Sequence, residues 1–335
     1  MRTIRLTEHT FLQGSYAATI GFFDGVHLGH RFVVQQLRHE AARRGMTPMV
    51  VTFDQHPRQL VQRGWQPQLL STLAEKEELL RQTGLDLLVV LPFTWEMAAL
   101  SARDFMQRVL KAQLGVSLLL TGYDNHFGHR EAGTSEGFHD YVAYGRELGI
   151  ELEALSYCSL SPLGSLVMKG ASGSSLPGKG EALSSSFIRH LIAEGRVAEA
   201  ELCLGRSYSL SGTVVHGHQV GRTIGFPTAN IELSGEAAHR LVPANGVYAV
   251  RVAVGSSPLL LPAVTNIGMR PTFDGHQRTI ETHILNFADD VYGLQLTIHF
   301  IARLRDEQPF SSPEQLARQM ACDADRARQL LTLNP

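Results

Sequence analysis

Two histidines three residues apart, His27 and His30, lie in the segment ATIGFFDGVHLGHR, residues 18–31. Gly25 and Gly29 permit a close approach of the backbone to a ligand, and the helix predicted to follow offers unsatisfied N–H groups and a positive dipole end. An imidazole donates hydrogen bonds and carries charge when a phosphate neighbour favours it. The pattern favours a phosphate site. A zinc pair and two structural histidines remain alternatives, although zinc needs a third ligand and no cysteine is near.

A second candidate anion site lies in SSSFIRH, residues 184–190. Ser184, Ser185 and Ser186 are good N-cap residues for the helix that follows, and capping alone would explain them. Arg189 lies about one turn into that helix, where its guanidinium can reach a phosphate held at the helix end. Together with the histidines, these residues would supply a second clamp for a polyphosphate.

The segment GHQVGRTIGFPTANIEL, residues 217–233, combines a glycine-rich loop with two oxygen ligands. Glycines four residues apart, of which Gly221 and Gly225 are two, let the loop lie close to a ligand, although tight turns need glycine too. Thr228 and Asn230 follow in a strand-like run and point to the same face. A hydroxyl and a carboxamide oxygen suit a magnesium ion that also holds nucleotide phosphates.

A carboxylate follows in the strand-like run TIETHIL, where Glu281 shares one face with Thr279 and His283. Ile280 and Ile284 occupy the opposite face, which favours the core. In so apolar a strand, Glu281 is either a surface group or a base at the mouth of a site.

The segment GASGSSLPGKGEAL, residues 170–183, contains a partial match to a Walker A loop. Gly173 to Lys179 fit its first seven positions, but Gly180 stands where the magnesium-binding hydroxyl belongs. Pro177 would also interrupt the nest of backbone N–H donors. We interpret this stretch as a flexible loop that does not bind nucleotide.

The elements of the first half must position the histidines. Apolar strand-like runs alternate with helical patterns, which predicts a parallel sheet covered on both faces. Ligands of such sheets bind beyond the carboxyl ends of the strands, where the histidine segment lies. The predicted strands are 17–21, 49–53, 86–91 and 116–122, and the predicted helices are 28–45, 72–84, 101–115 and about 135–149.

From about residue 205 the pattern changes to short β-branched and aromatic runs separated by Gly, Pro and Asn. These runs predict an antiparallel sheet or a small barrel, followed by a helix over 311–331. The length of 335 residues itself favours two domains.

Composition excludes several classes of protein. The formal net charge is −2, and the charges are well mixed, which argues against a nucleic-acid partner. Cys158, Cys203 and Cys322 are far apart, so we expect a reducing, cytoplasmic location. We expect no secretory signal and no membrane association, because the N-terminus lacks an apolar region and the apolar runs are short. Homo-oligomerisation stays open.

Read together, these motifs resemble the bacterial bifunctional riboflavin kinase/FMN adenylyltransferases, also called FAD synthetases, over nearly the whole chain. The first half contains GFFDGVHLGH, TFDQHPR, TGYDNHFGHREAG and SSSFIR. The second half contains LGRSY, GRTIGFPTAN, NGVYAVRV, TNIGMRPTF, IETHILNF, VYG and RDEQPF. So many motifs in order make the match highly specific.

The resemblance implies an α/β fold: a Rossmann-like HxGH nucleotidyltransferase domain, then a six-stranded antiparallel β-barrel riboflavin kinase domain. We place these domains at residues 1–190 and 191–335. The implied reactions convert riboflavin to FMN and then FMN to FAD and pyrophosphate, each with ATP and Mg²⁺.

The resemblance also implies roles for individual residues. Catalysis falls to Glu281, His27, His30 and Arg189, and magnesium binding to Thr228 and Asn230. Implied nucleotide contacts are Gly21, Phe23, Asp24, Gly29, Ser185, Ser186, Gly221, Arg222, Gly225 and Pro227. Implied flavin contacts are Asp124, Asn125, Arg270 and Arg305, and a surface salt bridge is the alternative for Arg305.

The chain departs from the family pattern at Phe22, at Asn125 and His126, at Ser186 and in the longer 170–183 segment. Two alternatives to the bifunctional enzyme remain. One is another nucleotidyltransferase with a regulatory flavin-binding β-domain, and the other is a non-catalytic flavin carrier.

Overall fold

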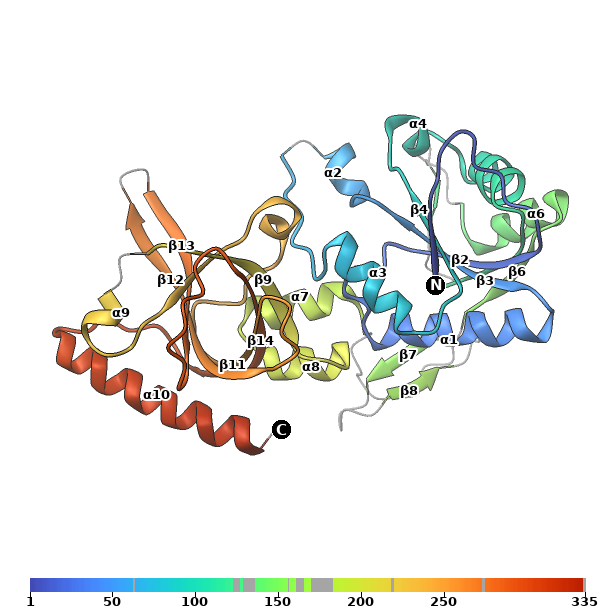
Figure 1. The fold of residues 1–335 in the computed structure, drawn as a ribbon. Helices are drawn as coiled ribbons and strands as arrows, with labels where there is room; N and C mark the ends of the chain where they lie inside the picture. The colour runs from blue at the N-terminus through green and yellow to red at the C-terminus, as the bar shows by residue number, and fades with distance from the viewer. Residues whose placement is uncertain are drawn as a thin grey trace. The chain divides into compact units, whose positions relative to one another are not determined.

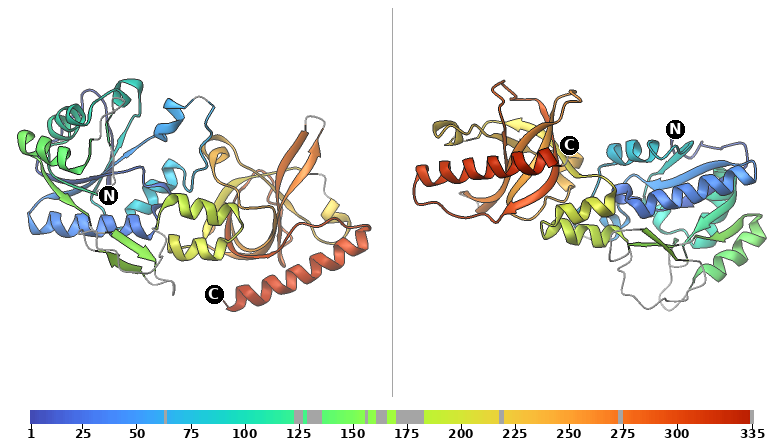
Figure 2. Two further views of the ribbon diagram at one scale, coloured as in Figure 1. Left: turned by 180° about the vertical axis from the view of Figure 1, so that it is seen from behind. Right: turned by 90° about the horizontal axis from the view of Figure 1, so that it is seen from below.

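The computed structural model describes residues 1–62, 64–122, 127–128, 136–155, 157–160, 166–169, 183–217, 220–272 and 275–333. The chain divides into two compact units, which we describe one at a time. The first comprises Met1–Pro67 and Ser71–Ser184, and the second comprises Gln68–Leu70 and Ser185–Pro335. Figure 1 and Figure 2 show the elements of each unit as ribbons.

A parallel sheet forms the centre of the first unit. Its six strands run in the order β1-β4-β3-β2-β5-β6, and every neighbouring pair is parallel. They are β1 (Arg2–Arg5), β2 (Tyr16–Ile20), β3 (Thr47–Phe53), β4 (Leu87–Leu91), β5 (Val116–Thr121) and β6 (Glu151–Ala154). The predicted α/β sheet is confirmed. The sequence predicts the four inner strands but not the edge strands β1 and β6, which have four residues each and little apolar pattern.

Helices cover both faces of this sheet. They are α1 (Leu28–Arg43), α2 (Pro57–Val61), α3 (Leu73–Arg81), α4 (Trp95–Ala98), α5 (Ala102–Asp104), η2 (Phe105–Gln113) and α6 (Phe138–Leu148). A short antiparallel pair, β7 (Tyr157–Leu160) and β8 (Leu166–Lys169), is separate from the main sheet.

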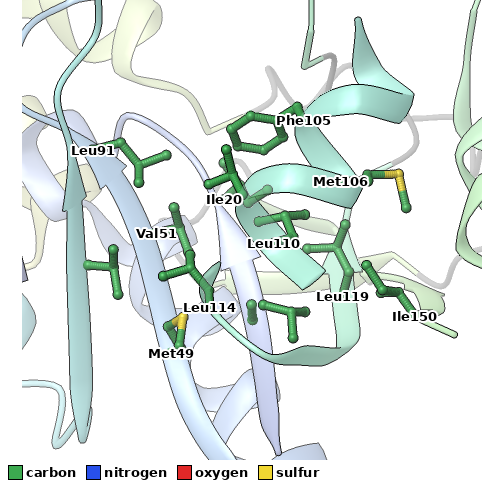
Figure 3. Close-up of a cluster of buried hydrophobic side chains, with 14 of the residues drawn as sticks. Ile20, Met49, Val51, Leu91, Phe105, Met106, Leu110, Leu114, Leu119 and Ile150 are labelled. Atoms are coloured by element: carbon green, nitrogen blue, oxygen red, sulfur yellow. The ribbon is translucent and has the colours of Figure 1, made fainter. Parts of the chain in front are cut away.

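Two apolar clusters lie on opposite faces of the sheet, because successive side chains of a strand point to opposite sides. The cluster in Figure 3 joins strand residues to η2 and includes Ile20, Met49, Val51, Leu91, Phe105 and Leu110. The other joins strand residues to α1 and α3 and includes Val34, Leu37, Val50, Leu80, Leu88 and Val90. The sheet is therefore held rigidly, and its strand ends form a fixed platform.

The start of α3 is fixed by a capping box. The hydroxyl of Thr72 accepts a hydrogen bond from the backbone N–H of Glu75 at 3.2 Å, and the Glu75 carboxylate accepts one from the Thr72 N–H at 2.7 Å. This reciprocal pair satisfies two backbone donors that would otherwise lack partners in the first turn. Ser71, which directly precedes the cap, is held in place with it.

A closed antiparallel barrel forms most of the second unit and confirms the predicted fold. Its strand order is β10-β13-β12-β11-β14-β9, and each neighbouring pair is antiparallel. The strands are β9 (Tyr208–Val215), β10 (Ala229–Glu232), β11 (Gly246–Val254), β12 (Leu261–Thr272), β13 (Gly275–Ile284) and β14 (Gln295–Arg305). Alternation sets the two faces: on β13, Ile280 and Ile284 are buried, as the sequence predicts.

Helices pack around the barrel. They are α7 (Ser185–Ala193), α8 (Val197–Leu204), α9 (Val220–Thr223) and α10 (Pro313–Leu333), the last drawn red in Figure 1. Ala324, Ala327 and Leu331 of α10 pack against Val247 and Leu304 on the outer surface of the barrel. In the described part of the chain, no helix combines the length and hydrophobicity needed to cross a bilayer.

Candidate active sites

The histidine segment forms a tight turn between β2 and α1. Phe23 and Val26 have positive φ angles of 52° and 37°, and Gly25 lies between them at 75°. Such conformations are costly for residues with a Cβ and persist where surrounding structure enforces them. The turn brings the chain from the carboxyl end of a central strand directly to the N-terminus of α1.

His27 and His30 lie together at that N-terminus. His27 is the N-cap residue of α1, and its Nδ1 accepts a hydrogen bond from the backbone N–H of His30 at 3.4 Å. The two rings stack with centroids 3.7 Å apart. A Cβ on Gly29 would lie 3.0 Å from Cε1 of His27, so glycine at this position leaves room for the ring. The two imidazoles thus lie together at the positive end of the α1 dipole, and their role in binding phosphate stays a prediction.

Asp24 and Phe23, implied as nucleotide contacts, have buried side chains. The Asp24 carboxylate is 2% exposed and accepts a hydrogen bond from the Ser71 N–H at 3.1 Å. The Ser71 hydroxyl in turn accepts one from the Gly25 N–H at 3.0 Å. Phe23 is 3% exposed within the core that α1 covers. The buried Asp24 carboxylate thus holds the turn against Ser71, at the start of α3.

An apolar cavity of about 280 Å³ opens at the carboxyl ends of β2 and β3. Its wall includes Gly21, which the sequence indicated, and aromatic side chains, which it did not. The lining residues are Ile20, Gly21, Phe22, Phe53, Pro57, Phe93, Met97, Ala98, Phe105, Phe127 and Gly128. Phenylalanines at or just beyond the carboxyl ends of predicted strands, such as Phe53 and Phe93, were the available signal. An apolar cavity beyond parallel strand ends is a typical ligand site.

Ser185, Ser186 and Arg189 belong to α7 and hence to the second unit. The helix begins at Ser185, so Ser184 occupies the N-cap position, and Ser185 and Ser186 lie in the first turn. Arg189 is half-buried, and its Nε donates a hydrogen bond to the carbonyl oxygen of Gln68 at 2.8 Å. The three residues therefore lie along one turn of α7 in the second unit, whereas the two histidines belong to the first unit. Their role as a phosphate clamp stays a prediction.

The second unit brings the proposed magnesium ligands and Glu281 together. In the barrel, Asn230 on β10 and Asn266 on β12 both stand opposite Glu281 on β13. The hydroxyl of Thr228 donates to Oε2 of Glu281 at 3.5 Å. Ala229, which separates Thr228 from Asn230, is buried. One outward-facing row thus carries a hydroxyl, a carboxylate and two carboxamides.

The glycine-rich segment before this row is partly helical. The sequence predicts a loop, but residues 220–223 form α9, and residues 218–219 lie outside the described residues. The Phe226 N–H then donates to the Gly221 carbonyl at 2.8 Å, and Gly225 adopts a φ of 84°. His283 contacts the Pro227 carbonyl through Nδ1 at 2.8 Å. This turn fixes where Thr228 enters the site.

Gly221→Ala is expected to slow riboflavin phosphorylation by about 10²-fold, since displacing a reacting group by about 1 Å can cost that much. A Cβ at this position would lie 2.2 Å from the Phe226 carbonyl oxygen, so the turn before Thr228 must shift. Steady-state rates of FMN formation check this. Thr223→Ala, an exposed position on the same helix, is the control. A Gly221→Ala rate within a few-fold of wild type would contradict the expected displacement.

Two cavities meet at Thr228. The first, of about 320 Å³, we call the α10-side cavity, and it is lined by Gly221, Thr228, Val247, Val264, Asn266, Glu281, His283, Arg305, Glu307, Gln308, Phe310, Leu316, Met320 and Asp323. The second, of about 350 Å³, we call the loop cavity, and it is lined by Val214, Arg222, Pro227, Thr228, Ala229, Thr282, Ile284 and residues 287–292. Because Thr228 lines both, a group bound in one cavity can approach a group bound in the other at this residue.

Arg305 lies in the wall of the α10-side cavity and forms a salt bridge there. Its NH2 donates to Oδ2 of Asp323 at 2.8 Å, and Asp323 is 5% exposed. Gln319 donates to the same carboxylate at 2.9 Å, and the guanidinium lies 5.8 Å from the Phe310 ring. Arg305 therefore lines the cavity and forms a salt bridge that is largely buried, unlike the surface salt bridge given as its alternative.

Several predicted contacts fall where the structure gives no side chain. Asp124 and Asn125 lie outside the described residues, and so do residues 170–182. The backbone of Arg270 pairs with Gln277 in the barrel, while its side chain is not described. Within the described ranges, no group of three or more His, Cys, Asp or Glu side chains is gathered for a metal ion, so the zinc alternative gains no third ligand there.

Deleting residues 173–180 is expected to leave the KM for ATP nearly unchanged in both reactions. The segment lacks the hydroxyl of a Walker A loop, and the nucleotide groups predicted above lie elsewhere. KM measurements with riboflavin and with FMN as the second substrate check this. A folded deletion variant that no longer binds ATP would show that the Walker-like segment binds nucleotide.

Both halves of the chain match known families. Residues 11–161 match the FAD synthetase family, and residues 204–331 match the riboflavin kinase family. The bifunctional riboflavin kinase/FMN adenylyltransferase of Escherichia coli K12 is 36% identical over 317 residues, covering 94% of this chain and 92% of its own length. The Bacillus subtilis protein of the same name is 32% identical over 335 residues, covering 98% and 97%.

A solved structure is similar over nearly the full length. It is titled as a macrolide-efflux protein from Streptococcus pneumoniae and is 28% identical, with a TM-score of 0.81. The alignment covers 97% of this chain and 98% of that one. The two-unit architecture is thus shared with an experimentally determined structure.

Proposed function

This chain belongs to the bifunctional riboflavin kinase/FMN adenylyltransferases, and we propose how its residues divide the two reactions between the two units. It phosphorylates riboflavin to FMN and adenylylates FMN to FAD. Because the family match covers both halves of the chain, it overturns the two alternatives, a different nucleotidyltransferase and a non-catalytic flavin carrier. Our proposal concerns the residues, the metal and the places where the substrates bind.

The kinase reaction takes place at Thr228 and Glu281. Riboflavin occupies the α10-side cavity, where Arg305 contacts it, and ATP occupies the loop cavity beside Arg222 and Pro227. The observation that carries this proposal is that Thr228 lines both cavities and contacts Glu281. The ribityl 5′-hydroxyl must lose its proton as its oxygen attacks the γ-phosphorus and the bond to the β-phosphate oxygen breaks. Glu281 accepts that proton.

Thr228 and Asn230 would hold the Mg²⁺ ion of the kinase. A hydroxyl and a carboxamide oxygen are hard ligands of the kind that Mg²⁺ prefers, so the residues fit the ion. The carboxamide of Asn230 packs closely against Gly217, because a Cβ at that glycine would overlap it. When bound, the ion neutralises charge on the β- and γ-phosphates.

The adenylyltransferase reaction takes place at His27 and His30. An oxygen of the FMN phosphate attacks the α-phosphorus of ATP, and the bond to the departing pyrophosphate breaks. This oxygen is already ionised at neutral pH, so the site needs positioning and charge stabilisation and no base. The imidazoles and the N-terminus of α1 supply donors, and the turn at Gly21, Phe23, Asp24 and Gly29 supplies backbone groups.

The remaining predicted residues complete this division. Ser185, Ser186 and Arg189 act as a second phosphate clamp for the adenylyltransferase, which is why we keep the functional boundary after residue 190. The apolar cavity takes the isoalloxazine ring of FMN, with Asp124 and Asn125 as further contacts. Arg270 contacts riboflavin, and Gly221 and Gly225 shape the nucleotide loop of the kinase. A cytoplasmic location is retained, and homo-oligomerisation stays open.

The kinase assignment is tested by the Mg²⁺ requirement of Thr228→Val, which keeps the side-chain shape and removes the hydroxyl oxygen. FMN formation should need about 10–100-fold more Mg²⁺, the range typical of weakened metal sites. FAD formation from supplied FMN should keep its normal Mg²⁺ dependence. Thr279→Val is the matched control, because Thr279 lies on the same face of β13 as Glu281. An unchanged Mg²⁺ dependence of FMN formation in Thr228→Val would overturn the metal assignment.

A further inference from the structure

A lysine is buried behind the apolar cavity of the first unit. Lys76 lies on α3 and is 2% exposed. Its Nζ donates to the hydroxyl of Thr52 at 3.4 Å and to the carbonyl oxygen of Phe53 at 3.3 Å. Removing an ammonium group from water is costly, so it persists where interactions in the fold compensate. These contacts place the charge at the carboxyl end of β3.

The same ammonium contacts a wall of the cavity. Nζ lies 4.0 Å from the centroid of the Phe22 ring, within the range of a cation–π interaction. The Thr52 hydroxyl, which Lys76 contacts, donates to the carbonyl oxygen of Phe22 at 3.1 Å. Phe22 and Phe53 both line the cavity. Lys76 therefore fixes the backbone at two wall residues and the ring of one.

The start of α3 holds the other part of the adenylyltransferase site. Ser71 is hydrogen-bonded to Asp24 and Gly25 in the turn before the histidines. A single capped helix thus fixes the histidine turn through Ser71 and the aromatic wall through Lys76. Ser71 and Lys76 are close in sequence. The segment that contains them therefore resists displacement of the cavity wall relative to the histidine turn.

We propose that Lys76 is a positioning residue for FMN in the adenylyltransferase reaction, which it serves by holding Phe22 and Phe53 in the wall of the apolar cavity. The inference rests on the proposed function, in which that cavity takes the isoalloxazine ring. Lys76 touches neither phosphate nor the reacting atoms in this scheme. Its removal should therefore weaken FMN binding selectively, without a matching loss of ATP binding.

The test compares Lys76→Met, Phe22→Leu and the double variant by FMN fluorescence titration and by steady-state kinetics. Each single substitution should raise the Kd and the KM for FMN about tenfold, equivalent to about 1.4 kcal/mol, with the KM for ATP unchanged. The double variant should lose less than the sum of the two single variants, because both remove the contact between Lys76 and Phe22. The matched control is Lys111→Met on η2, which removes an ammonium that donates to the carbonyl oxygen of Gly149 at 2.8 Å and should bind FMN normally.

FAD formation by the same preparations at saturating FMN, with an unchanged KM for ATP, shows that the first unit of each variant is folded. If Lys76→Met alone misfolds, Phe22→Leu still reports on the contact from its other side. Normal FMN affinity in Lys76→Met, additive losses in the double variant, or an equal rise in the KM for ATP would each overturn the inference.

Ala98→Phe separates this inference from the proposed function. Ala98 lines the cavity, so a phenyl group there should fill it and abolish FMN binding. If Ala98→Phe binds FMN normally, the flavin site is elsewhere and the proposed function fails for this cavity. If Ala98→Phe abolishes binding while Lys76→Met does not change it, the cavity assignment stands and only the role of Lys76 fails.

Discussion

Glu281→Gln is expected to lower the rate of FMN formation by about 10²–10⁴-fold, the usual effect of losing a general base. The ribityl alcohol has a high pKa and cannot attack the γ-phosphorus efficiently while it keeps its proton. Glutamine keeps the size of glutamate and an oxygen that can still accept from Thr228, but it is not basic. The measurement is the rate of FMN formation at saturating riboflavin and ATP.

Two controls separate loss of the base from other damage. FMN supplied to Glu281→Gln should be converted to FAD at the normal rate, because that reaction uses the first unit. The Kd for riboflavin should change little, since the side chain keeps its shape. If FMN formation stays within a few-fold of wild type, Glu281 is not the base.

His30→Ala and Arg189→Ala are each expected to lower FAD formation by about 10²–10³-fold, as for removal of one donor that stabilises developing charge. Each substitution removes a proposed phosphate contact of the adenylyltransferase and lies outside the strands of the barrel. Riboflavin should therefore still become FMN at the normal rate. Chromatographic separation of FMN and FAD in one reaction measures both outcomes.

His39→Ala is the matched control for the histidine. His39 lies on the same helix as His30, is exposed, and is remote from the helix N-terminus. For the arginine, Arg189→Lys keeps the charge but not the planar fork, so it should retain part of the activity. If both alanine variants give wild-type FAD yields, His30 and Arg189 do not belong to the adenylyltransferase site.

The parts of the fold that depend on the local spacing of apolar residues could be predicted. Strands β2 to β5 are apolar along nearly their whole length, and the alternation on β13 separates Glu281 from Ile280 and Ile284. The same period predicts that Thr228 and Asn230 share a face. Strand pairing then brings them to Glu281, and this step depends only on which strands become neighbours.

The cavity walls could not be predicted, because they join residues far apart in sequence. Phe22, Phe53 and Phe105 meet only after the sheet and η2 have packed. Asp24 illustrates a different difficulty: its place beside the histidines favours a ligand contact, yet its carboxylate is buried against Ser71. The local motif around the histidines indicates that the carboxylate has a role, but it does not indicate whether that carboxylate contacts a ligand or another part of the chain.

The edges of the first unit's sheet bear on how the protein avoids aggregation. A barrel strand has two partners, whereas β1 and β6, within the part of the chain that the structure describes, each pair with a strand on one side only. Both edges are short and charged: Arg2 and Arg5 stand on β1, and Glu151 and Glu153 on β6 are paired with Arg44. Adding a foreign strand would require stripping water from these groups. The charged edges thus disfavour edge-to-edge association of the folded sheet, whereas each strand of the closed barrel already has two partners.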